Sequence, residues 1–415
     1  MTKATVKVQK KSRIVLSKSS EEFSLCNKGS IESAVKLANF LRNASINKYV
    51  LYGHQNDQHM KAGSRSKRFS SSDTYDICKH FAAVNGFDAL CLTGNEFGKW
   101  YWTLEDRINA LVKYAEKVVK NGSILSLSAH MPNFDFIFKR LNSNSEKIIN
   151  EDGSLSDGSI NFSGYTPIVL EGNVVQEVMP GKKLNEIYKS YLNMIADFCL
   201  ELQKKSVSLI WRPFHENTGG WFWWGKNTCT AEEYIALWQY TWNYFVKEKN
   251  VNNLIWAYSP GSEPKTLAEF DERYPGDDYV DLIGFDMYQH LPEQKDNFFS
   301  EFKSQLKLVS DFALLHKKLF ACTETGVANP NNKALLETGN EDKDWYKKVL
   351  SLCSEYGACY FLLWANFSSR GAYYSPYVEK KKGLLVKRIY GHELLDSFIK
   401  MYNDSRSIFS KINLD

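Results

Sequence analysis

The chain has 415 residues, of which 43% are apolar and 24% are charged, and these proportions are typical of a folded protein with a large core rather than a disordered one. The formal net charge is only +4, and Lys380–Lys382 is the longest run of like charge. A solvated loop explains this run, so a nucleic-acid-binding protein is not expected. No stretch of about 18 apolar residues occurs, which excludes a predicted transmembrane helix.

The chain is predicted to start with an extended or loose arm over residues 1–25, followed by a single domain over residues 26–415. The first residues, MTKATVKVQKKSR, are basic but lack the apolar core of a signal peptide. Either the protein is cytosolic or the sequence begins after a signal that has been removed.

Eight short apolar runs bounded by Gly, Asn or Pro are predicted to be strands. In chain order they are Tyr49–His54, Ala89–Thr93, Ile124–His130, Ser208–His215, Leu254–Tyr258, Leu282–Tyr288, Leu319–Thr323 and Cys359–Ala365. Helices are predicted around and between them, at about 31–43, 74–85, 104–121, 185–204, 230–248, 265–272, 298–317, 343–356 and 393–401. This alternation of strands and helices is typical of the (β/α)8 or TIM barrel, so the predicted fold class is α/β.

A long polar connection, residues 142–183, follows the third strand. A loop of this length usually takes part in binding, although its composition also fits a flexible decoration. The eight cysteines show no CxxC and no zinc-finger spacing, so structural zinc is not expected. Cys91 and Cys322 lie in apolar runs and are interpreted as small core residues of strands.

Glutamates stand at the ends of the fourth and seventh predicted strands, where a barrel of this kind carries its active residues. The alternation of a strand places Arg212, Phe214 and Glu216 on one side. Singly, Glu216 or Glu324 could be an ion pair at the barrel rim, for example with Arg212. Together they are what cleavage between sugars requires, namely an acid for the leaving oxygen and a carboxylate facing the anomeric carbon.

The surroundings of the two glutamates predict different roles. Glu216 precedes the loop NTGGWFWWG, whose indoles would remove solvent and raise its pKa, as a general acid needs. Glu324 lies on a Thr-Glu-Thr-Gly turn, whose hydroxyls and backbone N–H groups suit a nucleophile. The many aromatic residues, 11 Trp, 23 Tyr and 25 Phe, can stack on sugars, although an isolated Trp is interpreted as core.

Histidines and carboxylates at barrel strand ends also build metal sites, and five residues could be combined into one: His54, His130, His215, Glu216 and Asp286. The first-strand His-x-His of metal-dependent barrel hydrolases is absent, since Gly53–Asn56 offers a single histidine. No metal or other cofactor is therefore predicted.

The block Trp211–Gly225, WRPFHENTGGWFWWG, resembles the signature of glycoside hydrolase family 26, the β-mannanase family in a clan of retaining (β/α)8 glycosidases. The likeness extends through four shorter segments and covers about residues 35–400; these segments are Tyr52–Gln55, Ser128–Asn133, Asp281–Tyr288 and Thr323–Gly326.

The resemblance implies roles for eight residues. Glu216 matches the family's acid/base and Glu324 its nucleophile. The other six match residues that bind substrate or support the glutamates: Arg212, which helps to keep the nucleophile ionised, His215 beside the acid/base, His130 at the cleaved sugar, Trp221 of the loop, Tyr288 placed to hydrogen-bond the nucleophile, and Trp364 under the reacting sugar.

The resemblance further implies a retaining endo-β-1,4-mannanase that cleaves mannan, glucomannan or galactomannan by double displacement, with its carboxylates about 5–5.5 Å apart. A β-1,4-xylanase or β-1,3/1,4-glucanase of the same fold, an exo-acting mannobiohydrolase and a non-catalytic glycan-binding barrel stay open. Loops 142–183 and 328–342 are expected to select the sugar. We expect a secreted monomer that binds a β-mannan-type glycan and neither nucleic acid nor membrane, with a cytoplasmic location left open.

Overall fold

The computed structural model describes residues 1–11, 16–17, 22–98, 102–143, 160, 162, 167–292, 295–328, 335–367, 372–382, 388–412 and 414. The two polar loops predicted over residues 142–183 and 328–342 lie partly outside these ranges, so their role in sugar selection stays a prediction. Within the described part, no helix is both long and apolar enough to cross a membrane.

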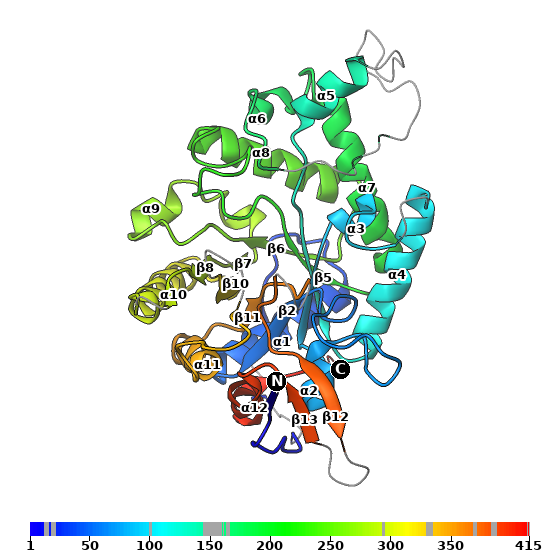
Figure 1. The fold of residues 1–415 in the computed structure, drawn as a ribbon. Helices are drawn as coiled ribbons and strands as arrows, with labels where there is room; N and C mark the ends of the chain where they lie inside the picture. The colour runs from blue at the N-terminus through cyan, green and yellow to red at the C-terminus, as the bar shows by residue number, and fades with distance from the viewer. Residues whose placement is uncertain are drawn as a thin grey trace.

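Eight parallel strands form the centre of the molecule (Figure 1), which confirms the predicted barrel. The sixth and seventh are each broken into two segments. The strands are β2 (Val50–Gln55), β3 (Val84–Asp88), β4 (Ile124–Ser128), β5 (Leu209–Arg212), β6 (Leu254–Tyr258), β7 (Leu282–Ile283) with β8 (Asp286–Gln289), β9 (Leu319–Phe320) with β10 (Cys322–Val327), and β11 (Tyr360–Leu363). All residues of β4 and β6 are buried, as is usual for parallel strands covered on both faces.

The barrel closes at the two broken strands. Hydrogen-bonded neighbours run in the order β8, β10, β11, β2, β3, β4, β5, β6, β7, β9, so each broken strand has one half at either end of this path. The Gly284 N–H donates to Tyr258 O at 2.7 Å and the Thr323 N–H to Phe285 O at 3.0 Å, which continues the ladder across the gaps. A Cβ at Gly284 would lie 2.5 Å from the Thr323 side chain, so only glycine fits there.

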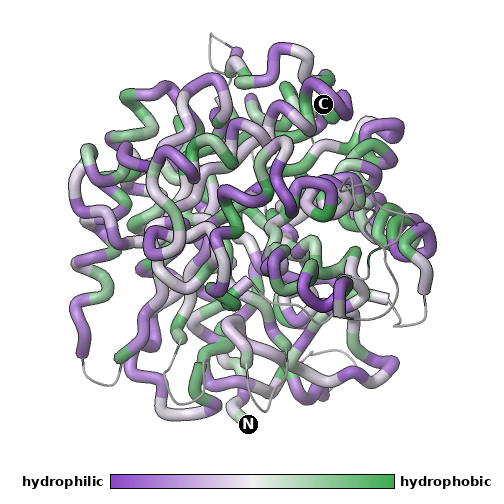
Figure 2. The backbone as a smooth tube through the Cα atoms, turned by 90° about the horizontal axis from the view of Figure 1, so that it is seen from above, coloured by the Kyte–Doolittle hydropathy of each residue, from purple (hydrophilic) through white to green (hydrophobic). Residues whose placement is uncertain are grey.

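Helices surround the barrel, and Figure 2 shows hydrophobic and hydrophilic stretches alternating along them, as in amphipathic helices that pack one side inward. The helices are α1 (Glu32–Ile46), α2 (Asp73–Cys78), α3 (Leu90–Thr93), α4 (Leu104–Lys120), α5 (Phe134–Ser143), α6 (Val174–Glu177), α7 (Asn185–Gln203), α8 (Ala231–Asn243) with the π-helical turn η1 (Tyr244–Glu248), α9 (Leu267–Asp271), the 3-10 turn η2 (Asp277–Tyr279), α10 (Phe298–Leu315), α11 (Trp345–Tyr356) and α12 (Leu395–Asn403).

Helix α1 covers the end of the barrel at which the strands begin. Its buried Leu37, Ala38 and Leu41 belong to one apolar cluster with the first residues of several strands, such as Leu282 and Leu319. The opposite end, where the strands finish and the predicted site residues lie, is therefore the end left for ligands.

The second strand was predicted in the wrong place. The run Ala89–Thr93 is not a strand, because Leu90–Thr93 forms helix α3, whereas Val84–Asp88 is strand β3. Helix α2, predicted to reach residue 85, ends at Cys78, where Lys79 takes a left-handed φ of 64°. Cys91 is accordingly a buried helical residue. A short apolar run does not distinguish a buried strand from one buried helical turn.

The prediction of a solvated loop at Lys380–Lys382 was also wrong. These residues lie in strand β12 (Val378–Lys382), which pairs with β13 (Arg388–Gly391) and, through it, with β1 (Thr2–Lys3) in a small antiparallel sheet. Outside this small sheet, another short strand, β14 (Ser407–Ile408), pairs with β2 of the barrel. The Thr5 and Val6 N–H groups donate to Asp396, so the first residues contact α12. The domain boundary at residue 26 stays a prediction.

Asn366, three residues after β11, ties the end of the eighth strand to its surroundings. Its side chain is fully buried and donates to Asp73 Oδ2 at 2.9 Å and to Ser375 O at 3.0 Å. Its Oδ1 accepts from the Tyr374 and Ser375 N–H groups at 2.9 and 3.0 Å. One amide therefore fixes the backbone that follows Trp364.

We expect Asn366→Ala to lower the free energy of unfolding by about 3 kcal/mol, because it leaves buried donors and acceptors without partners. Urea unfolding measures this. Asn243→Ala, which removes an exposed amide bonded only to Gln239 O, is the matched control and should change stability by less than about 0.5 kcal/mol. Equal effects of the two substitutions would contradict the buried network.

Candidate active site

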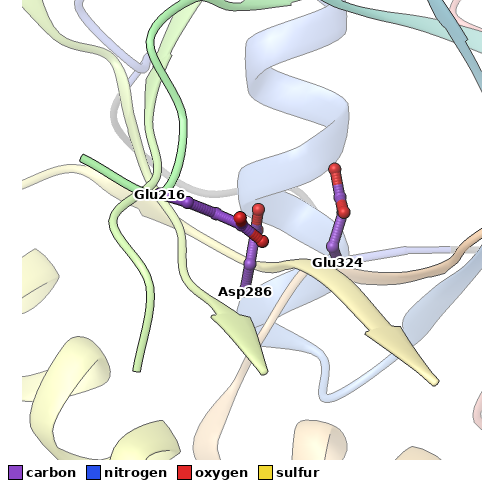
Figure 3. A group of neighbouring side chains, drawn as sticks. All are labelled: Glu216, Asp286 and Glu324. Carbon is purple, nitrogen blue, oxygen red and sulfur yellow. The ribbon is translucent and has the colours of Figure 1, made fainter. Parts of the chain in front are cut away.

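Three carboxylates meet at the end of the barrel where the strands finish. Asp286 begins β8, Glu324 lies in β10, and Glu216 follows β5. One oxygen of each lies within 4.8 Å of an oxygen of the other two, and Figure 3 shows the side chains grouped above the strands. Strand pairing places Glu324 opposite Asp286, so the closeness of this pair is set by backbone register.

Arg212, the last residue of β5, supplies the positive charge of the group. Its guanidinium donates to Asp286 Oδ2 at 2.7 Å, to Ser259 Oγ at 3.0 Å and to Glu324 Oε1. It is 2% exposed. Burial opposes its charge, but Asp286 and Glu324 outweigh burial and raise the pKa of Arg212. The predicted ion pair between Arg212 and a glutamate is therefore present, and it involves Glu324.

Glu324 is held from two sides. Arg212 donates to one oxygen, and the Tyr288 hydroxyl donates to the other at 2.8 Å. Glu324 is only 4% exposed. Its carboxylate is thus fixed in orientation, with a predicted site residue on each oxygen.

Glu216 stands on a sharp turn. Its φ is 54° and that of Phe214 is 49°, so β5 ends at Arg212 and the predicted alternation through Phe214 to Glu216 is wrong. Phe214 packs instead against the rings of Tyr234 and Trp238 of α8. The turn is held by a hydrogen bond from the Glu216 N–H to Ser259 O at 2.8 Å. It places Glu216 at the end of the barrel where the strands finish, which is called the mouth.

The proton affinity of Glu216 is set by burial. Desolvation and the charge of Glu324 raise its pKa to about 7, although a hydrogen bond from Trp221 and the charge of Arg212 oppose the rise. The Trp221 indole N–H donates to Glu216 Oε2 at 2.7 Å, and this ring is 43% exposed. The raised pKa was predicted, but the indole nearest to Glu216 restrains the rise rather than causing it.

Two histidines lie side by side next to the carboxylates, with their ring centres 4.6 Å apart. His130 Nδ1 lies 2.8 Å from Asp88 Oδ2. Burial would lower the pKa of His130, but the charge of Asp88 and this hydrogen bond raise it to about 9. Burial and the charges of Arg212 and His130 lower the pKa of His215 well below its ordinary value. One ring is therefore charged and the other neutral.

Aromatic rings line the histidine side of the site. The ring centre of Trp364 lies 5.7 Å from that of His130. The ring centre of Phe222 lies 5.7 Å from that of His130 and 5.1 Å from that of His215, and all three pairs are edge to face. Trp364 is half-buried, and its backbone N–H donates to Thr325 O at 3.3 Å. The structure thus places all eight predicted site residues around one mouth, on the segments of five different barrel strands.

Comparison with known proteins agrees with this arrangement. The family model described as Glycosyl hydrolase family 26 matches residues 27–364. The chain belongs to glycosyl hydrolase family 26. It therefore has the family's barrel fold.

Several proteins named as mannan endo-1,4-beta-mannosidases are similar to this family 26 chain. A mannan endo-1,4-beta-mannosidase of Bifidobacterium adolescentis is 28% identical over 333 residues, which are 78% of this chain and 30% of the relative. One from Bacillus subtilis strain 168 is 31% identical over 175 residues, 41% of each chain. The chain thus spans less than half of these two relatives in the matched regions.

Solved structures overlap more of the chain than these two relatives do. The catalytic domain of an endo-beta-1,4-mannanase from Bacillus sp. JAMB-750 superposes with a TM-score of 0.78 at 29% identity, covering 94% of both chains. A β-mannanase of Bacteroides ovatus superposes with a TM-score of 0.70 at 28% identity, covering 92% of this chain and 96% of the other.

Sequence reasoning missed three polar residues that support this family 26 site. Asp88 holds His130, Ser259 bonds Arg212 and the Glu216 backbone, and Asp286 pairs with Arg212. Asp88 ends a true strand, so correct placement of β3 would have found it. Asp286 was considered only as a metal ligand.

The cluster that could hold a metal ion differs from the set of residues considered from the sequence. Among the described residues, the group with metal-like spacing is Glu216, Asp286 and Glu324, without any of the three histidines. His54 instead bonds the buried Asp57 at 3.0 Å. Because Arg212 already pairs with two of the three carboxylates, a metal ion there would face a fixed positive charge.

We expect Asp88→Asn to lower the pKa of His130 from about 9 to below about 6.5, because burial and the positive charge of Arg212 would then be opposed by the charge of Glu324 without that of Asp88. NMR titration of the imidazole measures this shift. His130 has a raised pKa in the folded state, so its stabilising effect is full below about pH 6.5 and is lost as the pH rises towards 9.

Asp88→Asn should therefore lose this pH dependence of stability between those limits. Asp277→Asn, which removes the partner of the peripheral His316, is the matched control and should leave the His130 titration unchanged. A His130 that titrates alike in Asp88→Asn and in the unaltered protein would exclude the proposed pairing.

Proposed function

We propose that this chain is a retaining endo-β-1,4-mannanase in which Glu216 is the acid/base and Glu324 the nucleophile. The observation that carries the proposal is the approach of their oxygens to within 4.8 Å. Retaining enzymes hold their carboxyl groups about 5–5.5 Å apart, whereas inverting enzymes separate them by about 6.5–9.5 Å to admit a water molecule.

The partners of each glutamate support the division of roles. Glu216, with its pKa raised to about 7, can carry a proton near neutral pH and give it to the glycosidic oxygen. Glu324, fixed by Arg212 and Tyr288, can attack the anomeric carbon from the opposite face. The C–O bond to the leaving sugar breaks as the bond to Glu324 forms, and Glu216 then deprotonates the water that releases the product.

In this proposal the remaining predicted residues contact the reacting sugar. Trp364 offers an apolar face for the ring, while His130 and His215 offer polar edges beside it. A positively charged His130 donates from both nitrogens, one of which is engaged by Asp88, so the other is free for a sugar hydroxyl. Trp221, at the rim and bonded to Glu216, would contact the leaving side.

The choice of mannan is supported by the relatives, whose names specify mannan endo-1,4-beta-mannosidases. The fold and the glutamates by themselves do not select a sugar. Release of manno-oligosaccharides from glucomannan or galactomannan, with none from xylan or barley glucan, tests this choice. Products of mixed lengths from the interior of the chain would separate an endo enzyme from a mannobiohydrolase.

We further propose that the enzyme acts as a monomer outside the cell. All eight site residues come from one chain, so the site needs no partner subunit. A polysaccharide is too large to cross a membrane unaided, so its hydrolase meets it outside.

We expect Glu324→Ala to lower kcat on the order of 10⁴-fold and to abolish covalent trapping by a fluoro-sugar, which mass spectrometry detects. Glu232→Ala, which removes an exposed carboxylate on α8, should retain full activity. Near-normal turnover by Glu324→Ala would show that the nucleophile lies elsewhere.

We expect Glu216→Ala to lose about 10²- to 10⁴-fold in activity on polysaccharide, yet to lose much less on an aryl glycoside whose leaving group needs no proton. Rates on the two substrates measure the difference. Equal losses on both would remove the acid role from Glu216.

The pH profile gives an independent test of the acid. Activity as kcat/KM should fall above about pH 7, where Glu216 loses its proton. Trp221→Phe removes the indole N–H that lowers the pKa of Glu216, so the fall should move to higher pH. A shift to lower pH, or none, would contradict the hydrogen bond between Trp221 and Glu216.

A further inference from the structure

The small antiparallel sheet of β1, β13 and β12 carries a row of cations on its outer face. In β12, Lys380 and Lys382 are exposed while Lys381, between them, points inward and bonds Asp76 at 2.7 Å. Lys382 pairs in register with Arg388, and both Lys380 and Lys3 pair with Tyr390. In Figure 1 this sheet lies at the edge of the molecule, beside the N-terminus.

A neighbouring loop adds cations beside this sheet. The Ser64 N–H donates to Val378 O at 3.3 Å, and Lys381 lies 4.6 Å from the centre of the Phe69 ring. The loop between Ser64 and Phe69 therefore runs beside β12, the edge strand of the sheet. It presents three more exposed cations, Arg65, Lys67 and Arg68.

These side chains are called the basic face; they are Lys3, Arg65, Lys67, Arg68, Lys380, Lys382 and Arg388. Among the described residues, no carboxylate forms an ion pair with any of them, although many other surface lysines have such partners. The buried Asp76, which bonds the inward-pointing Lys381, is also paired with Lys61. Seven cations thus leave a local positive field on a chain whose net charge is only +4.

Tyr390 adds an apolar ring to the cations of the basic face. It is half-buried on the middle strand, and the Lys382 ammonium lies 5.8 Å from the centre of its ring. Adjacent strands lie about 4.8 Å apart, so Lys3 and Lys380 stand close on either side of the ring. An apolar ring flanked by cations matches a sugar ring that bears a carboxylate.

We propose that the basic face is a second glycan-binding surface, selective for an anionic polysaccharide built from uronic acids. Its charge complements a repeating carboxylate, and its shallow three-stranded surface suits an extended chain. Nucleic acid fits less well, since one tyrosine offers no platform for successive bases. The proposal does not depend on which neutral sugar is cleaved at the catalytic mouth.

Such a surface would change how the enzyme meets its substrate. An enzyme held on an acidic polymer stays near neutral polysaccharide in the same material, because tethering raises the effective local concentration. Exposed ion pairs are individually weak and screened by salt, so the enzyme could still move along the polymer.

The first test uses the full chain and polygalacturonate in affinity gel electrophoresis, with neutral dextran as the blank polymer. We expect retardation by polygalacturonate only, and a Kd that rises with salt. The variant K3Q/K380Q/K382Q should raise the Kd about tenfold. The charge-matched variant K113Q/K117Q/K120Q, which removes three exposed lysines of α4, should leave it within about twofold. Equal weakening by both variants, or no retardation of the unaltered protein, would overturn the proposal.

The second test separates sugar recognition from charge alone. Tyr390→Ala should raise the Kd for polygalacturonate about fivefold and leave binding to polyacrylate, a carboxylate polymer without sugar rings, unchanged. Tighter binding to RNA or to anionic lipid vesicles than to polygalacturonate would assign the face to another partner and reject the proposal. Unchanged mannan hydrolysis and unfolding midpoints in all variants would show that the catalytic barrel is intact, so the two proposals can fail separately.

Discussion

One buried arginine sets the electrostatics of the site. Arg212 carries a single positive charge and meets the carboxylates of both Asp286 and Glu324, while Glu216 lies within the same cluster. Burying charges is costly unless they are paired. Burial and the charge of Glu324 raise the pKa values of both Glu216 and Asp286, although Arg212 lowers both. Sharing one cation among three acids therefore leaves Glu216 with a raised pKa, which burial and Glu324 cause and Arg212 only moderates.

The breaks in the sixth and seventh strands make this sharing possible. Gly284 lets the backbone pass the Thr323 side chain at close range, and the ladder resumes with Glu324 opposite Asp286. Thr323 Oγ1 also donates to Asp286 Oδ1 at 2.7 Å, which orients that carboxylate towards Arg212. The irregular backbone here serves the charge cluster, whereas the regular strands around it provide rigidity.

The alternation of apolar runs with helical patterns was sufficient for the barrel. The eight candidate site residues, which the structure brings to one mouth, came largely from the resemblance to family 26, and their roles stay predictions. Sequence reasoning failed at β3, where a weak strand, Val84–Asp88, lies beside a more apolar helical turn. It failed again at Phe214, since only the left-handed φ values of Phe214 and Glu216 reveal that the strand has ended. Asp88 was not identified as a site residue because the strand that it ends was predicted in the wrong place. The pairing of Lys381 with Asp76 could not be inferred because it joins positions 305 residues apart.

The catalytic mouth and the basic face differ in their balance of charges, and this limits what each can bind. The mouth groups three carboxylates, one of which can carry a proton near neutral pH, around Arg212 and beside the paired His130 and Asp88, so it offers a polyanion little net attraction. The basic face attracts the same polyanion without competing for the mouth. Beyond about 10 Å at ordinary salt the two fields are largely screened from each other. A neutral polysaccharide at the mouth and an acidic one on the basic face can therefore be bound together without electrostatic conflict.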